Sequence, residues 1–577
     1  MLHTLTRSLR ENKGPALVTV LLSALEVVFE IVIPLFMSNL IDFGIEGGSM
    51  AAVWKFGAFL LLLAAFQLAT GVLAARIAAR ASVGFAANLR EDMYDNVQTF
   101  AFSNIDKFST ASIVTRLTTD TTNVQNAFQM LMRMAIRAPV MLIFSMIVSF
   151  RISRDISMTF LIILPILALA LFFIIRSVFP VFTRVFRTYD ELNNVVQENV
   201  RGIRVVKSFN QERHEIGKFG AISERIYKDF SKGERLITLN APLMQSCIYT
   251  CMIIISWLGA KAIIASGNDP ALGLTTGNLT ALITYAMQIL SSLMMLSMVF
   301  AMLTISLSSA RRIAEVLEER SDIPQPEQPV MTVRDGAVDF DHVSFVYASK
   351  ADKKVLDDID LHIRSGETIG IIGGTGASKS SLVQLIPRLY DVTGGKLTLG
   401  GVDVREYDLD TLRGAVAMVL QKNELFSGTI AENLRWGNEN ATDEQLRHAC
   451  KLACADEFIS AMPDGYDTHI EQGGTNVSGG QKQRLCIARA LLKKPKVLIL
   501  DDSTSAVDTR TDAQIQQALS TYIPDTTKII IAQRISSVQN ADRIVVLDDG
   551  RINAVGSHDE LLRSCEIYRE VYESQQK

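Results

Sequence analysis

The 577-residue chain is 48% hydrophobic and has a positive mean hydropathy, so it is too long for one compact core and too apolar for an ordinary soluble protein. Its formal net charge of -4 is nearly balanced, which gives no reason to expect nucleic acid or an acidic polymer as a partner. The six cysteines form neither a disulfide framework nor a zinc-binding spacing. At least two domains are expected, one of them in lipid.

Apolar segments long enough to cross a bilayer fill the first half of the chain. The six segments run through residues 16–40, 56–75, 134–150, 156–175, 246–265 and 279–307. No small-residue cleavage site follows the first segment, which predicts a retained anchor and not a signal peptide. Before it, residues 1–12 place leucines and arginines on a helical period, and this predicts a short helix lying on the membrane surface.

Two of the gaps between these spans are long, at 76–133 and 176–245, and both are rich in Arg and Lys. By the positive-inside rule they face the cytoplasm, and the short loops near 44–50 and 267–277 face outside. The long gaps contain few Pro or Gly residues, so they are expected to continue the membrane helices. At 1.5 Å per residue, roughly 25 extra residues would carry each helix about 35 Å into the cytosol.

A Pro-spaced stretch separates this half from the next. Pro324, Pro326 and Pro329 lie in a segment with neither a helical nor a strand period. We therefore predict a transmembrane domain over 1–320, a linker over 321–335 and a soluble α/β domain over 336–577.

The soluble half contains a near match to a phosphate-binding loop. A buried strand over 368–372 precedes a Gly-rich turn and a helix. The candidate nucleotide-binding residues there are Gly373, Gly374, Thr375, Gly376, Ala377, Ser378, Lys379, Ser380 and Ser381. In G-x-x-x-x-G-K-[ST] the backbone amides wrap the phosphates, the Lys meets the β and γ charges, and the hydroxyl holds Mg²⁺. Ser378 stands where the second Gly is expected. The alternative is an ordinary Gly-rich turn between a strand and a helix.

A second element strengthens the prediction of ATP and Mg²⁺ as ligands. Residues 496–501 form a hydrophobic strand that ends in Asp501, the arrangement that holds a metal ion opposite a phosphate loop. A buried strand can end in Asp by chance. Such a strand downstream of a phosphate loop, with Val477-Ser-Gly-Gly-Gln481 shortly before it, is much harder to attribute to chance.

At these residues the chain resembles a half-transporter of the ATP-binding cassette (ABC) family, of the exporter type, over nearly its whole length. Val477, Ser478, Gly479, Gly480 and Gln481 resemble the family signature, Ser505 to Asp508 the D-loop, Gln421 the Q-loop and Tyr347 the aromatic residue that stacks on adenine. Residues 471–476 lie where exporters carry the loop that touches the membrane domain.

The resemblance implies a fold and a cycle. The fold is an all-α six-helix membrane domain with long cytosolic extensions, fused to a cytoplasmic α/β P-loop domain, in the plasma membrane. Family domains dimerise head to tail, so each ATP lies between the phosphate loop of one subunit and the signature of the other. Ser380, Gln421 and Asp501 would hold Mg²⁺. Short coupling helices, near 106–112 and 209–214, would link closure of the nucleotide domains to opening of the membrane cavity.

Three positions depart from the family pattern. The residue after the metal Asp, normally the Glu that polarises the attacking water, is Asp502, and the switch His is Gln533. Asp is one methylene shorter than Glu, so its carboxylate should stop about 1 to 1.5 Å short of the water, outside the ~3.2 Å reach of a general base. Gln donates a hydrogen bond but cannot carry the charge of an imidazole. With Ser378 also crowding the loop, we expect this site to bind ATP and hydrolyse it slowly.

The nearly intact signature, with only Val477 in place of the usual Leu, leads to a hypothesis of a heterodimer. The signature would complete a competent site on a different subunit, whose Glu and His perform the hydrolysis. The alternatives are that each change is tolerated singly, or that one was introduced. A nucleotide-gated or regulatory membrane subunit with little hydrolysis also stays open. Import is disfavoured, because importers usually split these domains into separate chains.

Two features of the spans bear on the substrate, which we expect to be hydrophobic or amphipathic: drug-like, lipid or peptide. Methionines of the sixth span, Met294 and Met298 among them, suit varied apolar ligands, although such a stripe more often packs against a helix. Glu26 and Glu30 lie one turn apart in the first span, where a carboxylate is costly and should face a cavity or a partner. They could attract cations, or they could hydrogen-bond to neighbouring helices.

Overall fold

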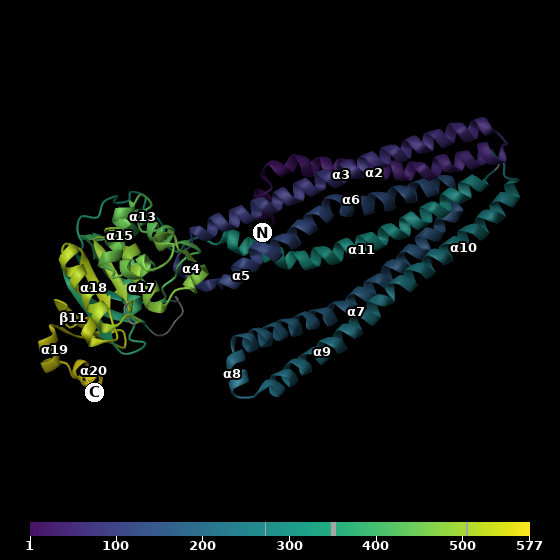
Figure 1. The fold of residues 1–577 in the computed structure, drawn as a ribbon. Coiled ribbons are helices and arrows are strands. Elements are labelled where there is room, and N and C mark those ends of the chain that lie inside the picture. The colour runs from purple at the N-terminus through teal and green to yellow at the C-terminus, as the bar shows by residue number, and fades with distance from the viewer. Residues whose placement is uncertain (272, 348–353, 504–505, 577) are drawn as a thin grey trace. The chain divides into compact units, whose positions relative to one another are not determined.

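The computed structural model describes residues 1–271, 273–347, 354–503 and 506–576. The chain forms two compact units, one of Met1–Gln98 with Thr110–Glu319 and the other of Thr99–Ser109 with Arg320–Lys577. Figure 1 follows the chain through both units. The sequence-based division placed all of 1–320 in the membrane domain, whereas in the structure the short segment Thr99–Ser109 belongs to the second unit.

The first unit is helical. Its helices are α1 (Leu2–Arg7), α2 (Lys13–Asn39), α3 (Met50–Gln98), α5 (Thr110–Thr115), α6 (Thr121–Ile152), α7 (Arg154–Arg201), α8 (Ile203–Ser208), α9 (Glu212–Thr238), α10 (Asn240–Ser266) and α11 (Thr276–Glu318), with one 3-10 turn, η1 (Arg10–Asn12), and two π-helical turns, η2 (Leu40–Glu46) and η3 (Arg116–Asp120). Within the described residues, six stretches are long and apolar enough to cross a membrane: Arg10–Glu46, Met50–Gln98, Thr110–Ile152, Arg154–Arg201, Glu212–Ser266 and Thr276–Glu318. The six predicted spans are confirmed.

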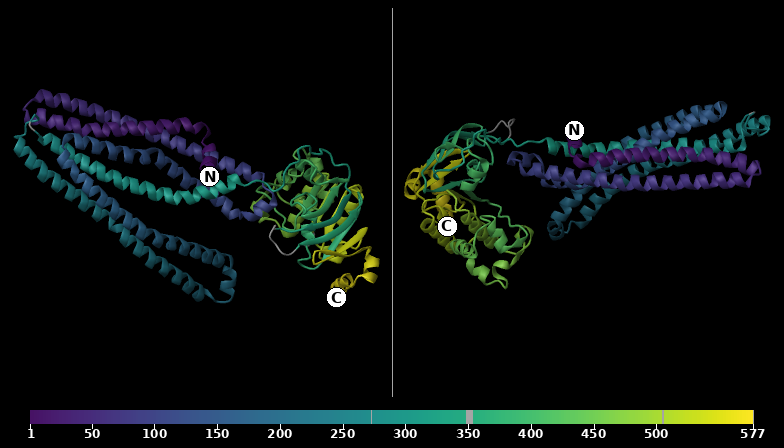
Figure 2. Two further views of the ribbon diagram at one scale, coloured as in Figure 1. Left: turned by 180° about the vertical axis from the view of Figure 1, so that it is seen from behind. Right: turned by 90° about the horizontal axis from the view of Figure 1, so that it is seen from above.

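The predicted extension of the membrane helices beyond the bilayer is also found. Helices α3 and α7 run for 49 and 48 residues without interruption. Figures 1 and 2 show α7 and α9 side by side, joined at α8, in an arm that diverges from α6 and α11. Aromatic packing of Phe182 on Phe230, with ring centroids 5.6 Å apart, and the 2.8 Å ion pair of Arg225 with Glu191 hold the two helices together.

The two short cytosolic helices begin earlier than predicted. They are α4 (Phe102–Lys107) and α8 (Ile203–Ser208), whereas we expected them near 106–112 and 209–214. Helix α8 is followed by a turn in which Asn210 takes a positive φ of 51° before α9 begins at Glu212. Asn adopts this left-handed conformation more readily than most residues, so the sequence favours a turn at residue 210.

The predicted N-terminal surface helix is shorter than expected and is tied to α3. Helix α1 ends at Arg7, and Leu5 is buried. Arg10 pairs with Glu91 at 2.7 Å and also with Asp92, which accepts a hydrogen bond from Ser8. Ser8 and Arg10 are therefore fixed to the cytosolic end of α3 by charge and hydrogen bonding.

Polar contacts join α2 to α11 at two levels. Next to α2, in η2, the carboxylate of Asp42 accepts hydrogen bonds from the Gly277 backbone N–H at 2.8 Å and from the Thr275 hydroxyl at 2.7 Å, where α11 begins. A Cβ at Gly277 would lie 2.3 Å from the Ser38 carbonyl oxygen, so glycine is required for this close approach. Deeper in the bundle, the buried Tyr285 hydroxyl donates to the Ile31 carbonyl at 2.6 Å.

The second unit is an α/β domain built on two main sheets. A four-stranded antiparallel sheet has the order β2 (Leu356–Ile363), β1 (Val338–Phe345), β4 (Gly394–Leu399) and β5 (Val402–Asp403), and a six-stranded sheet has the order β12 (Arg551–Gly556), β11 (Arg543–Asp548), β3 (Thr368–Gly373), β10 (Thr527–Ile531), β9 (Val497–Asp501) and β6 (Val416–Val419). A small hairpin pairs β7 (Gly428–Thr429) with β8 (His469–Ile470). The helices are α4, α12 (Lys379–Gln384), α13 (Leu409–Ala415), α14 (Ile430–Arg435), α15 (Asp443–Leu452), α16 (Asp456–Ser460), α17 (Gly479–Leu492), α18 (Thr509–Tyr522), α19 (His558–Ser564) and α20 (Glu566–Gln576), with 3-10 turns η4 (Gly465–Asp467), η5 (Gln472–Gly474) and η6 (Ile535–Ser537).

Strand β9 shows how this domain is held together. Val497 and Ile499 belong to the core that includes β1, β2 and α12, and Leu498 and Leu500 belong to the core that includes α14, α15 and α17. Successive side chains of a strand point to opposite faces, so a strand with both faces covered must be apolar throughout. The predicted α/β P-loop fold is confirmed.

Candidate nucleotide site and membrane charge cluster

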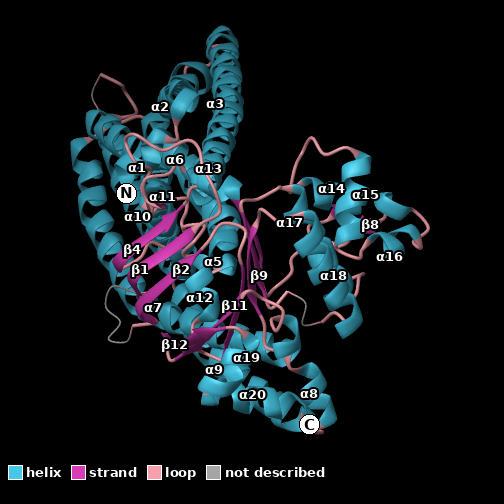
Figure 3. Ribbon diagram, turned by 90° about the vertical axis from the view of Figure 1, so that its left-hand side faces the viewer, coloured by secondary structure: helices cyan, strands magenta, loops and turns pink. Residues whose placement is uncertain are grey.

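The residues predicted to handle nucleotide follow the carboxyl ends of neighbouring parallel strands. The phosphate loop follows β3, Gln421 follows β6, Asp501 ends β9 and Gln533 follows β10. In an open parallel sheet the carboxyl ends meet along one edge, where ligands bind. Figure 3 shows β9 and α12 in this domain, with α14, α15 and α16 off to one side.

The phosphate loop is tightly built around its glycines and its lysine. A Cβ at Gly373 would lie 2.2 Å from the Leu547 carbonyl oxygen on β11, so only glycine fits there. The Lys379 ammonium donates to the carbonyls of Gly373 and Gly374, both at 2.9 Å. Burial lowers the pKa of Lys379, and the charges of Asp501 and Asp502 oppose that shift. The loop therefore holds a cation at the place where phosphate oxygens would bind.

Ser378, the departure within this loop, adopts a backbone conformation that suits glycine. Its φ is +67°, in the left-handed region, directly before α12. An L-residue there brings its Cβ too close to the following carbonyl, at a cost of about 1 kcal/mol. The loop keeps the expected path although the residue is not the one that fits it best.

Asp501 and Ser380 form a pair suited to Mg²⁺. Asp501 is 4% exposed, and burial raises the pKa of its carboxyl, with a hydrogen bond from Ser380 acting in the opposite direction. One carboxylate, one hydroxyl and the nearby Gln421 amide are oxygen donors of the kind that Mg²⁺ prefers, and phosphate oxygens and water usually supply the remaining ligands. The residues present therefore fit the predicted metal.

Asp502 lies between the two glutamines. Its Oδ2 accepts a hydrogen bond from Gln533 Nε2 at 2.9 Å and a longer one from Gln421 Nε2 at 3.4 Å. Its φ of +48° places it in the left-handed region at the end of β9. The structure thus brings together two of the three positions that depart from the family pattern, Asp502 and Gln533, and joins them directly.

Tyr347, predicted to stack on adenine, follows β1 and is 45% exposed. Its hydroxyl lies 2.7 Å from the hydroxyl of Ser381, in the helix that begins with Lys379. Its ring meets the ring of Tyr390 edge-on, with centroids 5.1 Å apart. Sequence reasoning missed Tyr390, which lies outside any motif.

The predicted signature residues start α17. Ser478 caps the helix: its hydroxyl accepts from the Gln481 N–H at 3.3 Å, and Gln481 Oε1 accepts from the Ser478 N–H at 2.9 Å. Gly479 and Gly480 face Ala506, which belongs to the predicted D-loop, and a Cβ at Gly480 would lie 2.9 Å from the Ala506 carbonyl oxygen.

The D-loop prediction is only partly covered by the structure. Asp508 caps α18 by accepting from the Thr511 N–H at 3.0 Å, and Ser505 lies outside the described residues. No hydrogen bond joins the signature to the phosphate loop among the residues that the structure describes. Completion of a site by the signature of a second subunit therefore stays a prediction.

In the membrane unit, Glu26 and Glu30 share a cationic partner. Arg137 of α6 donates to Glu26 Oε1 at 2.8 Å and to Glu30 Oε2 at 2.6 Å, and the side chains of the three residues are 25% exposed or less. The sequence left two interpretations of these carboxylates open, attraction of cations or hydrogen bonding to neighbouring helices. The structure contains hydrogen bonds to a neighbouring helix. Sequence reasoning missed Arg137, although an arginine inside an apolar span is itself a signal that a carboxylate lies nearby.

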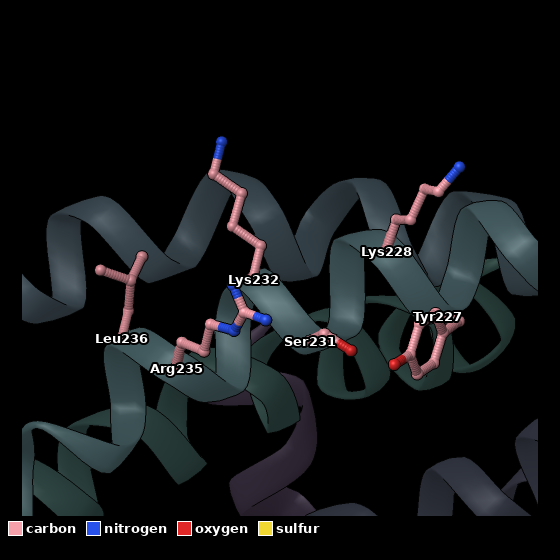
Figure 4. Close-up of a pocket in the computed structure, with 6 residues that line it drawn as sticks. All are labelled: Tyr227, Lys228, Ser231, Lys232, Arg235 and Leu236. Atoms are coloured by element: carbon pink, nitrogen blue, oxygen red, sulfur yellow. The ribbon is translucent and has the colours of Figure 1, made fainter.

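The predicted methionine surface is exposed on α11, with Met294 at 46% and Met298 at 62%. One turn apart, they lie on the same side of the helix. A broad groove of about 560 Å³ instead lies along α9, lined by Tyr227, Lys228, Ser231, Lys232, Arg235 and Leu236. Figure 4 shows that all six side chains come from this one helix, so the groove is an open basic face and not an enclosed substrate cavity.

Comparison with known proteins agrees with this architecture. Residues 16–294 match the ABC transporter transmembrane region, and residues 356–505 match the ABC transporter domain. The chain is 35% identical over 558 residues to the uncharacterised ABC transporter ATP-binding protein YfiB of Bacillus subtilis, covering 97% of this chain and 96% of that protein. It is 30% identical to an ATP-dependent lipid A-core flippase of Desulfotalea psychrophila, over 85% of this chain and 84% of that protein.

A solved structure shares the fold across both units. A bacterial Atm1-family ABC exporter with ATP bound superposes with a TM-score of 0.80 at 24% identity, covering 99% of each chain. The chain belongs to the ABC transporter family, as an exporter half-transporter with a transmembrane and an ATP-binding domain. It is a multi-pass membrane protein whose ATP-binding domain is cytoplasmic, and the family couples ATP hydrolysis to transport.

Replacing Ser378 by Gly should raise the affinity of this chain for ATP several-fold, because glycine removes the side chain that we expect to crowd the phosphate loop and also suits the φ of +67°. Equilibrium binding of a fluorescent ATP analogue measures the change. Ser378→Ala is the matched control, since it removes the hydroxyl and keeps the Cβ. Equal tightening by both variants would assign the effect to the hydroxyl and not to the backbone.

Proposed function

We propose that this chain is one half of a heterodimeric exporter, in which it carries the weakly hydrolytic ATP site and lends its signature to a competent site on the partner. The transported substrate would be hydrophobic or amphipathic: drug-like, lipid or peptide. ATP and Mg²⁺ would bind at both sites, and turnover would occur mainly where the partner supplies the catalytic residues.

The hydrogen bond from Gln533 to Asp502 carries this proposal. A general base must present a free lone pair within about 3.2 Å of the proton that it abstracts. Here both glutamine amides donate to the same oxygen of the shorter Asp502 carboxylate, Oδ2, at 2.9 and 3.4 Å, which holds that oxygen toward the glutamines, and Gln533 cannot supply the positive charge of an imidazolium. Lys379, Ser380 and Asp501 have the chemistry that binding needs. The site is thus suited to hold ATP and poorly suited to cleave it.

The double substitution Asp502→Glu with Gln533→His should turn the weak site into a hydrolytic one. A positioned base typically contributes 10²-fold to 10⁴-fold, so ATP turnover of the purified complex should rise at least tenfold when the partner's own site is inactivated. A steady-state phosphate-release assay measures it.

Asp501→Asn added to the double variant is the matched control, because it removes the metal ligand and should return turnover to background. Brisk turnover by the unmodified chain purified alone would contradict the proposal.

A nucleotide-gated or regulatory subunit is the second candidate, and it is favoured by the same pair of substituted positions. A gate passes its substrate down a gradient without ATP turnover, whereas a pump accumulates it against one. Uptake into inverted vesicles, with the partner's hydrolysis blocked, separates the two. Sustained flux under that block would support the gate.

The charge cluster of Glu26, Glu30 and Arg137 supports a preference for cationic amphipathic substrates. Two carboxylates and one guanidinium give this cluster a formal charge of one negative unit within the apolar bundle. The side chains of Glu26, Glu30 and Arg137 are 11, 23 and 25% exposed, respectively. A substrate cation can compensate that charge at little cost, whereas an anion would add to it. The similarity to a named lipid flippase supports an amphipathic substrate class without specifying the headgroup.

Replacing all three of these residues by Gln should abolish the preference for cations while keeping export of neutral compounds. The predicted loss of about tenfold in the cation-to-neutral ratio corresponds to an interaction of about 1.4 kcal/mol. Transport of matched cationic and neutral dyes into vesicles measures the ratio. The single variant Arg137→Gln is the control, because it leaves two carboxylates unpaired and should raise the ratio. Equal loss of both dyes would count against a role in selectivity.

A further inference from the structure

The segment Thr99–Ser109 joins the ATP-binding unit although its neighbours in sequence belong to the membrane unit. It contains α4, which is flanked by Phe100 and Phe108, both buried, whose rings stack with centroids 6.0 Å apart. The chain enters it from α3 and leaves it toward α6, which are both membrane-crossing helices. Any displacement of this segment is therefore transmitted along the chain to the two membrane-crossing helices on either side of it.

Asn104 anchors the segment to the linker that precedes the ATP-binding domain. The side chain is 1% exposed, its Nδ2 donates to the Arg320 carbonyl at 2.9 Å, and its Oδ1 accepts from the Ala101 N–H at 3.0 Å and the Asp322 N–H at 3.4 Å. These contacts hold the segment in place without reaching the nucleotide residues.

Tyr390 makes the contact that does lead toward the nucleotide residues. Its hydroxyl donates to Asp106 Oδ2 at 2.8 Å, and its ring packs 6.0 Å from the ring of Phe102. Burial, followed by the hydrogen bond to Asp106, raises the pKa of Tyr390, so its hydroxyl stays protonated as a donor at neutral pH. One side of Tyr390 is therefore fixed to α4 by both apolar and polar contact.

On its other side, Tyr390 packs against the aromatic residues at the end of β1. Its ring lies 5.6 Å from the ring of Phe345 and meets Tyr347 at an angle of 89° with centroids 5.1 Å apart. Phe345 is 2% exposed and forms part of the core, so its ring has no room to move. Tyr347, by contrast, is half-exposed, and its hydroxyl forms a hydrogen bond with the hydroxyl of Ser381, in the helix that follows the phosphate loop. A rotation of Tyr347 must therefore be accommodated at Tyr390.

We propose that Tyr390 transmits the position of the nucleotide-binding aromatic Tyr347 to the segment Thr99–Ser109, and so couples occupancy of the ATP site to the membrane helices. Tyr390 is a positioning residue, because it makes no contact with the phosphate loop lysine or with the metal-site residues among the described contacts. The inference rests on the assignment of Tyr347 to adenine. It does not depend on which of two sites hydrolyses ATP.

The test compares Tyr390→Phe and Asp106→Ala in the complex reconstituted into vesicles. Tyr390→Phe keeps the ring and removes the hydroxyl, so photolabelling of this chain by 8-azido-ATP should keep its affinity within about twofold. Substrate transported per ATP should fall about tenfold, the scale set by loss of a hydrogen bond to a charged group. Asp106→Ala, which removes the acceptor, should reproduce the fall, and the double variant should be no worse than either single one, since both remove the same bond.

Tyr407→Phe is the matched control. Tyr407 is a buried tyrosine of the same domain whose hydroxyl donates to the Leu399 carbonyl at 2.8 Å, and its loss should leave transport per ATP unchanged. An unchanged ratio in Tyr390→Phe, or losses that multiply in the double variant, would overturn the proposal.

Tyr347→Ala separates failure of the proposal from failure of the adenine assignment. This variant should weaken labelling by 8-azido-ATP at least tenfold. Normal labelling would show that Tyr347 does not bind adenine and would overturn the proposed link from the nucleotide to Tyr390. It would not affect the assignment of the chain as an exporter.

Discussion

The parallel pairing of β9 with β10 and β6 determines how the residues of the nucleotide site lie relative to one another. Ile531 pairs with Asp501 across β10 and β9, and Ile531 also pairs with Ile371 on β3. This register sets the end of the metal-binding strand beside the start of the phosphate loop and places residue 533 next to residue 502. Because β9 is buried on both faces, the register cannot shift without exposing apolar side chains or burying Asp502. The contact between the two substituted positions is a consequence of the fold.

A different constraint organises the membrane unit. Carboxylates in an apolar bundle need compensation, and Arg137 supplies it to Glu26 and Glu30, tying α2 to α6. The same physical requirement, that buried polar groups find partners, explains Asp42 at the start of α11 and Tyr285 against α2. The bundle thus gains helix-specific contacts that apolar packing in lipid does not provide.

Much of this architecture is predictable from sequence, because it depends on local patterns. Span length is a property of a continuous apolar run, and the loop from Gly373 to Ser380 is a short contiguous motif. The positions missed are those defined by packing between distant segments. Arg137 lies 111 residues from Glu26, and Tyr390 lies 284 residues from Asp106. The early start of α4 depends on Asn104 binding the linker, which no periodicity in residues 99–112 encodes.

The most direct test is ATP turnover of this chain co-purified with its partner, comparing Asp502→Asn here with Glu→Gln at the corresponding position of the partner. The account predicts that the partner's substitution abolishes turnover and that Asp502→Asn leaves most of it. Equal loss from the two substitutions would contradict it, and would make Asp502 a working catalytic residue in one of two equivalent sites.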